Sequence, residues 1–289
     1  MKLDQVCVSD LDAWVRDGDA CGEDTLSFTW MGQAGFVMKS AGITFAVDLY
    51  LSDSLAQKYR GKRFAHVRMM RSPVDAASIR SCSFLLSSHG HTDHMDGETL
   101  LKIYDGEGDR PLFVCPRSQV GKAHERHVPL ERMVPLNEGE TVAFGDRFLV
   151  TALASAHETL AKDQWRNDIS LGYIVRIGNF TLYHSGDCIP YDGLVQKVAA
   201  YRPDVCFLPV NGRSALLSSQ GIAGNFTEHE ASELTREVGA RFLVPHHIGM
   251  FDFNTISTED LEKGLCADGW TIGVDTLIPT VSVVSILTK

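Results

Sequence analysis

Alternation of apolar and polar residues is clearest between residues 27 and 53, in SFTWMGQAGFVMKSAGITFAVDLYLSD. Three short apolar runs are separated there by glycine-containing turns, a pattern typical of antiparallel strands with tight connections. The pattern predicts a β-meander that ends near Asp48. The residues before this segment are helix-like, so we expect the chain to open with a helix.

Further strand-like runs follow along the rest of the chain. A buried strand is predicted from Ser83 to Ser87, and turns at 137–139, 145–146 and 178–179 separate later runs. These later runs are RPLFVCP, ERMVPLNEGETVAFGDRFLVTALASAH, SLGYIVRIGNFTLYHSGD, DVCFLPVNG and ARFLVPHH. Several of them end in His, Asp or Gly, so polar side chains are expected to gather at strand ends.

Helices are predicted between these strands, at 97–104, 118–124, 192–200 and from Thr227 onward. In the last segment Thr227 and Glu230 form a capping box, and Gly239 would end the helix. Strand-rich halves with interspersed helices predict an α/β (α+β) protein in which two sheets pack face to face under covering helices. Because no linker, low-complexity segment or repeat interrupts the sequence, we expect one domain over residues 1–289.

The composition limits the partners and the compartment. A formal net charge of -10 argues against nucleic-acid partners, because a protein that binds phosphates needs clustered Lys and Arg. No stretch is apolar enough to cross a bilayer, and the acidic N-terminus is unlike a signal peptide. The seven cysteines contain no C-x-x-C pair, which is typical of free thiols in a reducing compartment. We therefore expect a cytoplasmic protein without membrane or nucleic-acid partners.

The segment SSHGHTDHMDG follows the predicted strand at 83–87 and concentrates metal-binding side chains. Because side chains alternate along an extended backbone, His89 and His91 point the same way and can share one ion. Asp93 and His94 can then reach a second ion nearby. A polar surface loop is the alternative, but four potential ligands within six residues favour a metal site.

This loop cannot fill two coordination spheres, so further ligands are expected at other strand ends. TALASAHE ends a strand at His157, and LYHSGD ends one at Asp187. FLVPHHIG ends another at His246 and His247, which cannot both face the same way on an extended segment. Five imidazoles and two carboxylates suit zinc, manganese or iron.

These motifs, in this order, resemble the metallo-β-lactamase superfamily, and LYHSGD, NFTEHEA and VPHHIG are most similar to its L-ascorbate-6-phosphate lactonase group. The resemblance implies a four-layer αββα sandwich with two divalent metal ions at one edge of the paired sheets. It also implies hydrolysis by a metal-bridged hydroxide, with a lactone of a small, phosphorylated or otherwise anionic sugar acid as the substrate. The implied ligands are His89, His91 and His157 for the first ion, Asp93, His94 and His247 for the second, and Asp187 as the bridge. His246 would then support the site from behind.

Other candidates surround this core. The resemblance gives Asp93 a second role in orienting the nucleophile, and His184 would either donate to the substrate or support Asp187. We expect the Asp48 carboxylate to accept a hydrogen bond from a metal-binding histidine, donated by the ring N–H that does not face the metal. The long loop VNGRSALLSSQGIAGNFT is expected over the site as a substrate loop. Candidates for binding the substrate are Arg213, Asn211 and Asn225 in this loop, and Lys162 and Arg166 in ETLAKDQWRND.

Three points remain open from the sequence. AQKYRGKRFAHVRMMR, at 56–71, is rich in Lys and Arg and is interpreted as a solvated surface. A phosphodiesterase or nuclease of the same fold is an alternative function, because the same metals assist phosphoryl transfer. A second alternative to the hydrolase is a metal-binding protein without catalytic activity. Self-association into a homo-oligomer is compatible with exposed sheet edges.

Overall fold

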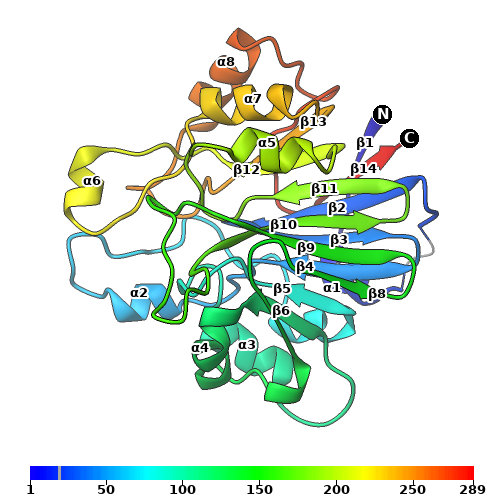
Figure 1. The fold of residues 1–289 in the computed structure, drawn as a ribbon, viewed down its shortest axis with the longest axis vertical. Helices are drawn as coiled ribbons and strands as arrows, with labels where there is room; N and C mark the ends of the chain where they lie inside the picture. The colour runs from blue at the N-terminus through cyan, green and yellow to red at the C-terminus, as the bar shows by residue number, and fades with distance from the viewer. Residues whose placement is uncertain (19–20) are drawn as a thin grey trace.

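Two β-sheets form the centre of the computed structural model, which describes residues 1–18 and 21–289 (Figure 1). Within these residues the first sheet has eight strands, in the order β1 (Lys2–Cys7), β14 (Val283–Thr288), β2 (Thr25–Gly32), β3 (Gly35–Ser40), β4 (Ile43–Val47), β5 (Phe84–Leu86), β6 (Leu112–Pro116) and β7 (Met133–Leu136). The second has six, in the order β13 (Phe242–His246), β12 (Val205–Pro209), β11 (Phe180–His184), β10 (Leu171–Ile177), β9 (Phe148–Ala154) and β8 (Thr141–Phe144). The predicted meander corresponds to β2, β3 and β4.

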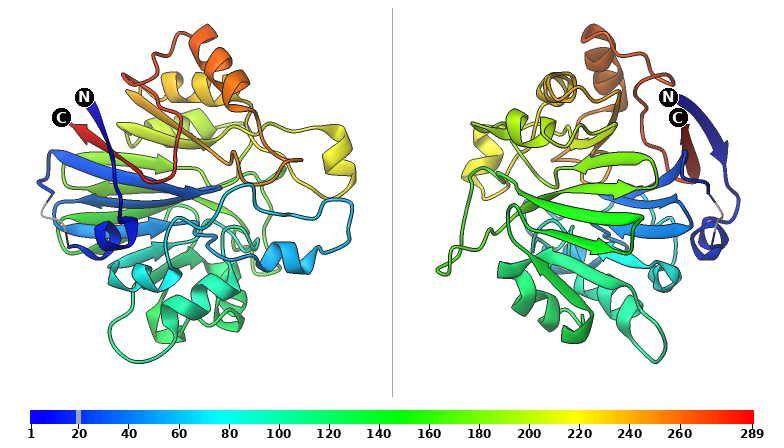
Figure 2. Two further views of the ribbon diagram at one scale, coloured as in Figure 1. Left: turned by 180° about the vertical axis from the view of Figure 1, so that it is seen from behind. Right: turned by 45° about the vertical axis from the view of Figure 1, so that its right-hand side comes forward.

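The sheets pack face to face through aromatic side chains, and Figure 2 shows them as adjacent layers. Phe207 on β12 contacts Phe28 and Phe36 of the other sheet edge-on, with ring centroids 5.4 and 5.0 Å apart. Phe148 on β9 stacks on Phe84 of β5 at 4.3 Å. Aromatic pairs of this kind stabilise a core beyond the area that they bury, so this layer fixes how the two sheets face each other.

Helices cover both outer faces and complete four αββα layers. The outer face of the first sheet packs against α1 (Leu11–Arg16), α3 (Gly97–Tyr104) and the 3-10 helix η1 (Ala76–Ser81) through a second apolar cluster. The second sheet is covered by α5 (Leu194–Ala199), α7 (Glu228–Glu237) and α8 (Thr258–Ala267). Shorter elements are α2 (Ser54–Lys58), α4 (Val120–Glu125), α6 (Ala215–Ser219), η2 (Arg117–Gln119) and η3 (Leu130–Arg132).

Local signals in the sequence fix several of these boundaries. Both hydrogen bonds of the predicted capping box join Thr227 and Glu230 at the start of α7. Gly239 follows the helix with a φ of 75°, a left-handed conformation that glycine adopts without strain. No disulfide joins the cysteines of the described residues.

The expected helix at the N-terminus is wrong for the first residues. Residues Lys2–Cys7 form β1, which pairs with β14 so that Lys2 faces Thr288 and the two ends of the chain lie side by side (Figure 1). The side chains of this edge strand are mostly exposed, so the sequence there lacks the apolar alternation that marks a strand. The helix begins only at Leu11. Among the residues that the structure describes, no helix is both long and apolar enough to cross a membrane.

Candidate metal centre and substrate cavity

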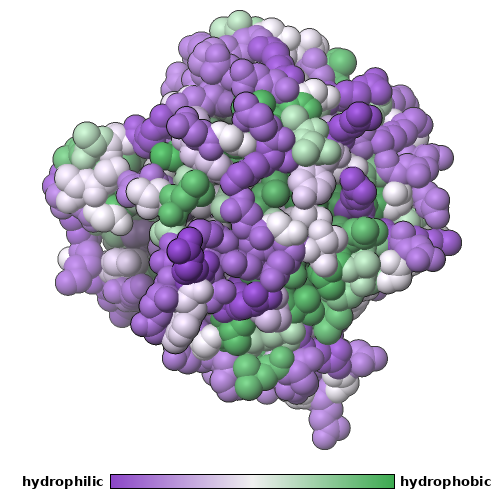
Figure 3. Space-filling view, viewed as in Figure 1, coloured by the Kyte–Doolittle hydropathy of each residue, from purple (hydrophilic) through white to green (hydrophobic). Residues whose placement is uncertain are grey.

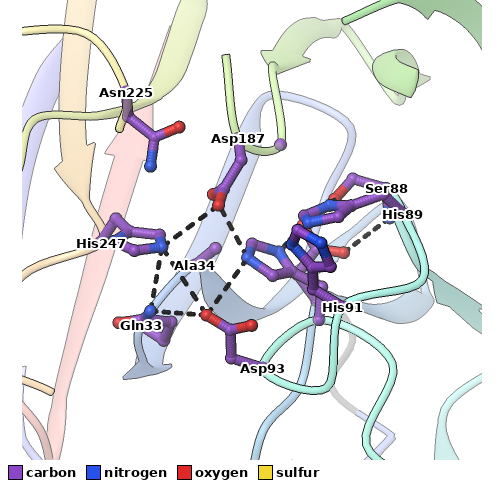
Figure 4. A network of polar contacts seen from close by, with 12 residues as sticks. Gln33, Ala34, Ser88, His89, His91, Asp93, Asp187, Asn225 and His247 are labelled. Carbon is purple, nitrogen blue, oxygen red and sulfur yellow. Dashed lines mark hydrogen bonds and ion pairs between the residues drawn. The ribbon is translucent and has the colours of Figure 1, made fainter. Parts of the chain in front are cut away.

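The predicted metal-binding side chains converge at one edge of the sandwich. Parallel pairing of β4 with β5, and of β11 with β12 and β13, brings the carboxyl ends of these strands to a common edge. Loops that leave these ends, together with the one after β9, carry the seven residues into one cluster, shown in part in Figure 4: His89, His91, Asp93, His94, His157, Asp187 and His247. Sequence positions almost 160 residues apart therefore meet in space.

The cluster divides into three overlapping groups of potential ligands. These are His89, His91 and His157; His89, His94 and Asp187; and Asp93, His94 and His247. Within each group the ligand atoms lie within 4.8 Å of one another. Donor atoms that share a tetrahedral zinc ion lie about 3.3 Å apart, so small side-chain rotations suffice for each group to hold a cation.

A buried nitrogen without a partner supports this interpretation. In the described part of the chain, His89 Nε2 is buried with neither a hydrogen bond nor an ion pair, whereas His94 Nε2 and Asp187 Oδ1 form an ion pair with each other. A buried polar atom left unpaired costs about 1–3 kcal/mol, so His89 Nε2 requires an explanation. A divalent cation supplies it, and the residues present fit one.

Asp187 lies between the two halves of the cluster. Its Oδ1 is 3.2 Å from His94 Nε2, and its Oδ2 is 3.3 Å from His247 Nε2 and 3.7 Å from His157 Nε2. Burial opposes ionisation of this carboxyl, but the imidazoles of His247 and His94 outweigh burial and hold its pKa well below the ordinary value. Asp187 is therefore an anion that can contact cations on both sides.

The imidazoles on the other side of Asp187 are held neutral. Burial, with a contribution from neighbouring histidines, lowers the pKa of His91 to about 4 and that of His89 well below its ordinary value. His91 Nδ1 lies 3.0 Å from His157 Nε2. Because only a neutral imidazole has a lone pair to give, these side chains are in the form that a metal ion requires.

Asp48 lies where the sequence prediction requires it. Its Oδ2 accepts a hydrogen bond from His94 Nδ1 at 2.9 Å, which leaves His94 Nε2 directed at Asp187. The Asp48 carboxylate also accepts hydrogen bonds from the backbone N–H and hydroxyl of Ser88, at 2.7 and 2.6 Å. Such outer partners fix the tautomer and the orientation of a ligand.

Gln33 is a site residue that the sequence analysis did not identify. It lies in the turn between β2 and β3, and its Nε2 donates to Asp93 Oδ2 at 2.8 Å and lies 2.9 Å from His247 Nε2 (Figure 4). A lone glutamine belongs to no metal-binding motif, so its residue type gave no signal. The available signal was its position in GQAGF, beside the two glycines of a tight turn.

The cluster opens into a cavity of about 510 Å³. One wall, here called the cationic wall, consists of Lys58, Lys62, Arg63, Lys122 and Arg126. Leu55, Tyr59, Phe64 and Ile222 provide apolar and aromatic surface. The segment around α2 and the loop after α6 lie on the same side of the molecule in Figure 1, and Figure 3 shows the mainly hydrophilic surface hollowed between them.

The cationic wall differs from the rest of the surface in its charge balance. Within residues 1–18 and 21–289, no carboxylate forms an ion pair with Lys58, Lys62, Arg63 or Lys122. Arg126 donates instead to the backbone oxygens of Gly90 and Met95, at 3.1 and 2.5 Å. Lys58, Lys62 and Arg63 are exposed, as the interpretation of segment 56–71 as a solvated surface expects, and they line this cavity as well.

The cations expected to bind the substrate lie elsewhere. Arg213 forms a two-pronged ion pair with Glu230, at 2.6 Å for each contact, beside a separate pocket of about 210 Å³. Lys162 pairs with Asp168, and Arg166 is exposed on the same loop. None of the three lines the cavity beside the metal cluster. We therefore correct this expectation: the charges of Arg213 and Lys162 are already neutralised by neighbouring carboxylates.

The substrate loop is placed as expected, but Asn211 and Asn225 are not at the cavity surface. Residues Gln220 to Ala223 of this loop line the cavity. Asn225 Nδ2 donates to Asn211 Oδ1 at 3.0 Å, and Asn211 Nδ2 donates to Asn254 Oδ1 at 2.8 Å. Of these three linked amides only Asn254 lines the cavity. Asn211 and Asn225 can therefore influence a ligand only by positioning Asn254.

His184 and His246 lie behind the cluster. His184 Nδ1 accepts from the Gly186 N–H at 3.1 Å, and its Nε2 donates to the Ala34 oxygen at 3.0 Å. Both ring nitrogens of His184 are thus engaged, so His184 has no N–H left to donate to a substrate. Its contact with the Gly186 N–H instead supports the backbone just before Asp187. His246 stacks on His184 with ring centroids 4.7 Å apart and forms no hydrogen bond to a described residue, while His247 faces the cluster.

Comparisons with known proteins agree with this geometry. A family profile described as "Beta-lactamase superfamily domain" matches residues 51–248. A UPF0173 metal-dependent hydrolase of Chloroflexus aurantiacus is 28% identical over 218 residues, covering 73% of this chain and 82% of that protein. The probable L-ascorbate-6-phosphate lactonase UlaG of Escherichia coli is 23% identical over 250 residues, covering 77% of this chain and 69% of that protein.

A solved structure shows the same fold. The metallo-β-lactamase fold protein YhfI of Bacillus subtilis aligns with a TM-score of 0.60 at 16% identity, covering 90% of this chain and 98% of that chain. The four-layer fold expected from the sequence is thereby confirmed. The chain belongs to the beta-lactamase superfamily and is a metal-dependent hydrolase close to the UlaG group.

Proposed function

We propose that this hydrolase uses two divalent metal ions to open a lactone, or a comparable ester, of a small anionic sugar acid. The observation that supports the proposal most is the cluster of potential metal ligands beside an open cavity with a cationic wall. A cluster that served only to stabilise the fold would be closed, whereas His91, Asp93, His157, Asp187 and His247 all reach the cavity surface.

Each residue of the cluster has a role in this proposal. His89, His91 and His157 hold the first cation, and Asp93, His94 and His247 hold the second. Asp187 contacts both, in keeping with the distances from its two oxygens to His94, His157 and His247. A set of five imidazoles and two carboxylates suits zinc, manganese or iron.

The chemistry divides between the cations and the chain. Bound divalent cations lower the pKa of a coordinated water toward neutrality and polarise the ester carbonyl, which promotes hydrolysis without a serine or cysteine nucleophile. The Asp93 carboxylate, whose side chain is 18% exposed, faces the cavity and orients the attacking water by accepting its hydrogen bond. Asp48 and Ser88 keep His94 and His89 in place from behind.

The cationic wall determines the class of substrate. Four side chains with unpaired positive charge face one cavity in a chain of net charge -10, so an anion is attracted to this cavity rather than to the general surface. A phosphate or carboxylate of the substrate binds there, while the lactone ring lies toward the metal centre. A volume of about 510 Å³ accommodates a small molecule of this kind.

Assays with purified protein test the proposal. A panel of phosphorylated, carboxylated and neutral lactones is assayed with zinc or manganese, and the His91→Ala variant serves as the control. We expect turnover of anionic lactones that the substitution abolishes. Turnover that persists in His91→Ala would reject the proposed site.

A phosphodiesterase is the second candidate, because the cationic wall would hold a phosphodiester as well as a phosphorylated lactone. The negative net charge disfavours polymeric nucleic acid, so a small phosphodiester is the expected substrate of this alternative. Faster hydrolysis of bis(p-nitrophenyl) phosphate than of every lactone would favour it. A metal content of one per chain, with no hydrolysis of either class, would instead indicate a structural metal site.

A further inference from the structure

Gln33 is held rigidly at the metal cluster by its own backbone. It has a φ of 52° and is 1% exposed in the turn between β2 and β3. Its carbonyl oxygen accepts hydrogen bonds from Trp30 Nε1 at 3.0 Å and from the His247 N–H at 2.9 Å. The main chain of Gln33 is therefore tied directly to the residue that carries a proposed ligand.

The side-chain amide of Gln33 contacts two of the proposed ligands, Asp93 and His247. A carboxylate can only accept, so the amide nitrogen of Gln33, and not its oxygen, must face Asp93 Oδ2 at 2.8 Å. The same nitrogen lies 2.9 Å from His247 Nε2 (Figure 4), and because an amide nitrogen can only donate, a hydrogen bond at this contact requires His247 Nε2 to accept. His247 Nε2 then accepts with the lone pair that it would otherwise give to a cation.

The two halves of the cluster differ in this respect. Asp93 and His247, two of the three proposed ligands of the second cation, are bonded to Gln33, a group outside the ligand set. In the first group the hydrogen bond joins two of its own ligands, His91 and His157, and His89 Nε2 has no partner among the described residues. A cation that binds to the first group therefore has to break only a contact between two of its own ligands.

We propose that Gln33 makes the second cation site the weaker one, so that the chain loads its cations in a fixed order. The first cation binds to His89, His91 and His157. The second binds to Asp93, His94 and His247 only after the Gln33 amide has left His247 Nε2. This inference rests on the proposed metal centre and adds to it a residue that controls how many ions are bound at a given metal concentration.

The size of the effect follows from the hydrogen bonds that must be broken. Because the second cation can bind only after contacts of the Gln33 amide are broken, the free energy of breaking them is subtracted from its binding. We expect this cost to lower the affinity of the second cation by about tenfold to a hundredfold. Asp93 Oδ2 accepts one of these contacts, at 2.8 Å. Removing the amide donor while retaining the bulk of the side chain should restore that affinity.

Equilibrium dialysis against buffered free zinc tests this inference, with bound metal per chain measured by mass spectrometry. The variants are Gln33→Met, which keeps the length but loses the donor, and Gln33→Asn, which tolerates the left-handed backbone but is shorter. Gln119→Met is the matched control, because the buried Gln119 amide donates to Ser118 Oγ at 3.1 Å and not to the cluster. His157→Ala identifies the binding step that belongs to the first group.

We expect wild type and Gln119→Met to bind two ions in two separated steps, and Gln33→Met to bind the second at least about tenfold more tightly with the first step unchanged. Melting curves in EDTA establish that each variant is folded, and Gln33→Asn replaces Gln33→Met if the latter is not. A second step that is unchanged or weaker in the folded variant would overturn the role of Gln33 alone. A wild-type chain that binds no zinc would overturn the metal centre itself.

Discussion

His94 and Asp48 form a buried pair in which Asp48 Oδ2 lies 2.9 Å from His94 Nδ1, and both side chains are fully shielded from solvent. Burial opposes protonation of His94, but the carboxylates of Asp187, Asp48 and Asp93 outweigh it and raise its pKa well above the ordinary value. A positively charged His94 thus compensates the carboxylates of the cluster, a task that a divalent cation would perform after displacing the proton from Nε2.

Replacing Asp48 should weaken metal binding although it is not itself a ligand. In Asp48→Asn the acceptor for His94 Nδ1–H and the Ser88 N–H loses its charge, and we expect a loss of about tenfold to a hundredfold in zinc affinity. Competition with a chromophoric chelator measures this loss. Ser88→Ala, which keeps Asp48, separates the contribution of Ser88, and an unchanged affinity in Asp48→Asn would contradict the orienting role.

Asp187 and His157 should differ in the number of ions that they control. Asp187 approaches histidines of both groups, whereas His157 belongs to the first group only. We therefore expect Asp187→Asn to reduce the metal content at both sites and His157→Ala to reduce it at one. Metal analysis after gel filtration distinguishes these outcomes, and equal losses in the two variants would argue against a bridging position for Asp187.

Removing charge from the cationic wall should affect anionic substrates selectively. For Lys58→Ala combined with Lys62→Ala, KM for a phosphorylated lactone should rise by about tenfold with kcat little changed, because charge-assisted contacts to the phosphate are lost. A neutral lactone should be unaffected. Arg213→Ala is the matched control, since Glu230 already neutralises that charge, and a larger effect of Arg213→Ala would move the anion site to the other pocket.

The contact between the two sheets should dominate stability. Phe207 is fully buried between Phe28 and Phe36, so Phe207→Ala removes a large aromatic ring and leaves a cavity that costs about 3–5 kcal/mol. Chemical denaturation monitored by circular dichroism gives this value. A cost below about 1 kcal/mol would mean that the sheets do not meet through this residue.

Much of the cluster could be predicted from the sequence because strand periodicity and residue type agree there. The strand Phe84–Leu86 leads directly into His89 and His91, and Asp187 and His247 likewise follow strands that are apolar enough to recognise. Once several strand ends carry ligands, their convergence follows from the common edge of the sheets.

Partners that depend on tertiary contacts could not be predicted in this way. The charge of Arg213 is cancelled by Glu230, which lies 17 positions away along the chain. Segment 56–71 lines the cavity only because the chain folds back over the cluster after Asp48, and nothing in its own pattern shows this. β1 escaped recognition because most of its side chains are exposed in its pairing with β14, so that its sequence lacks the apolar alternation of a strand.

A crystal structure of the zinc- or manganese-loaded chain, with anomalous scattering measured at the edge of the metal, tests the proposed metal centre most directly. We expect two peaks on either side of Asp187, the first about 2.0–2.3 Å from His89 Nε2 and the second at the same distance from His94 Nε2. A map without a peak within bonding distance of these nitrogens would contradict the metal centre and the hydrolytic function that depends on it.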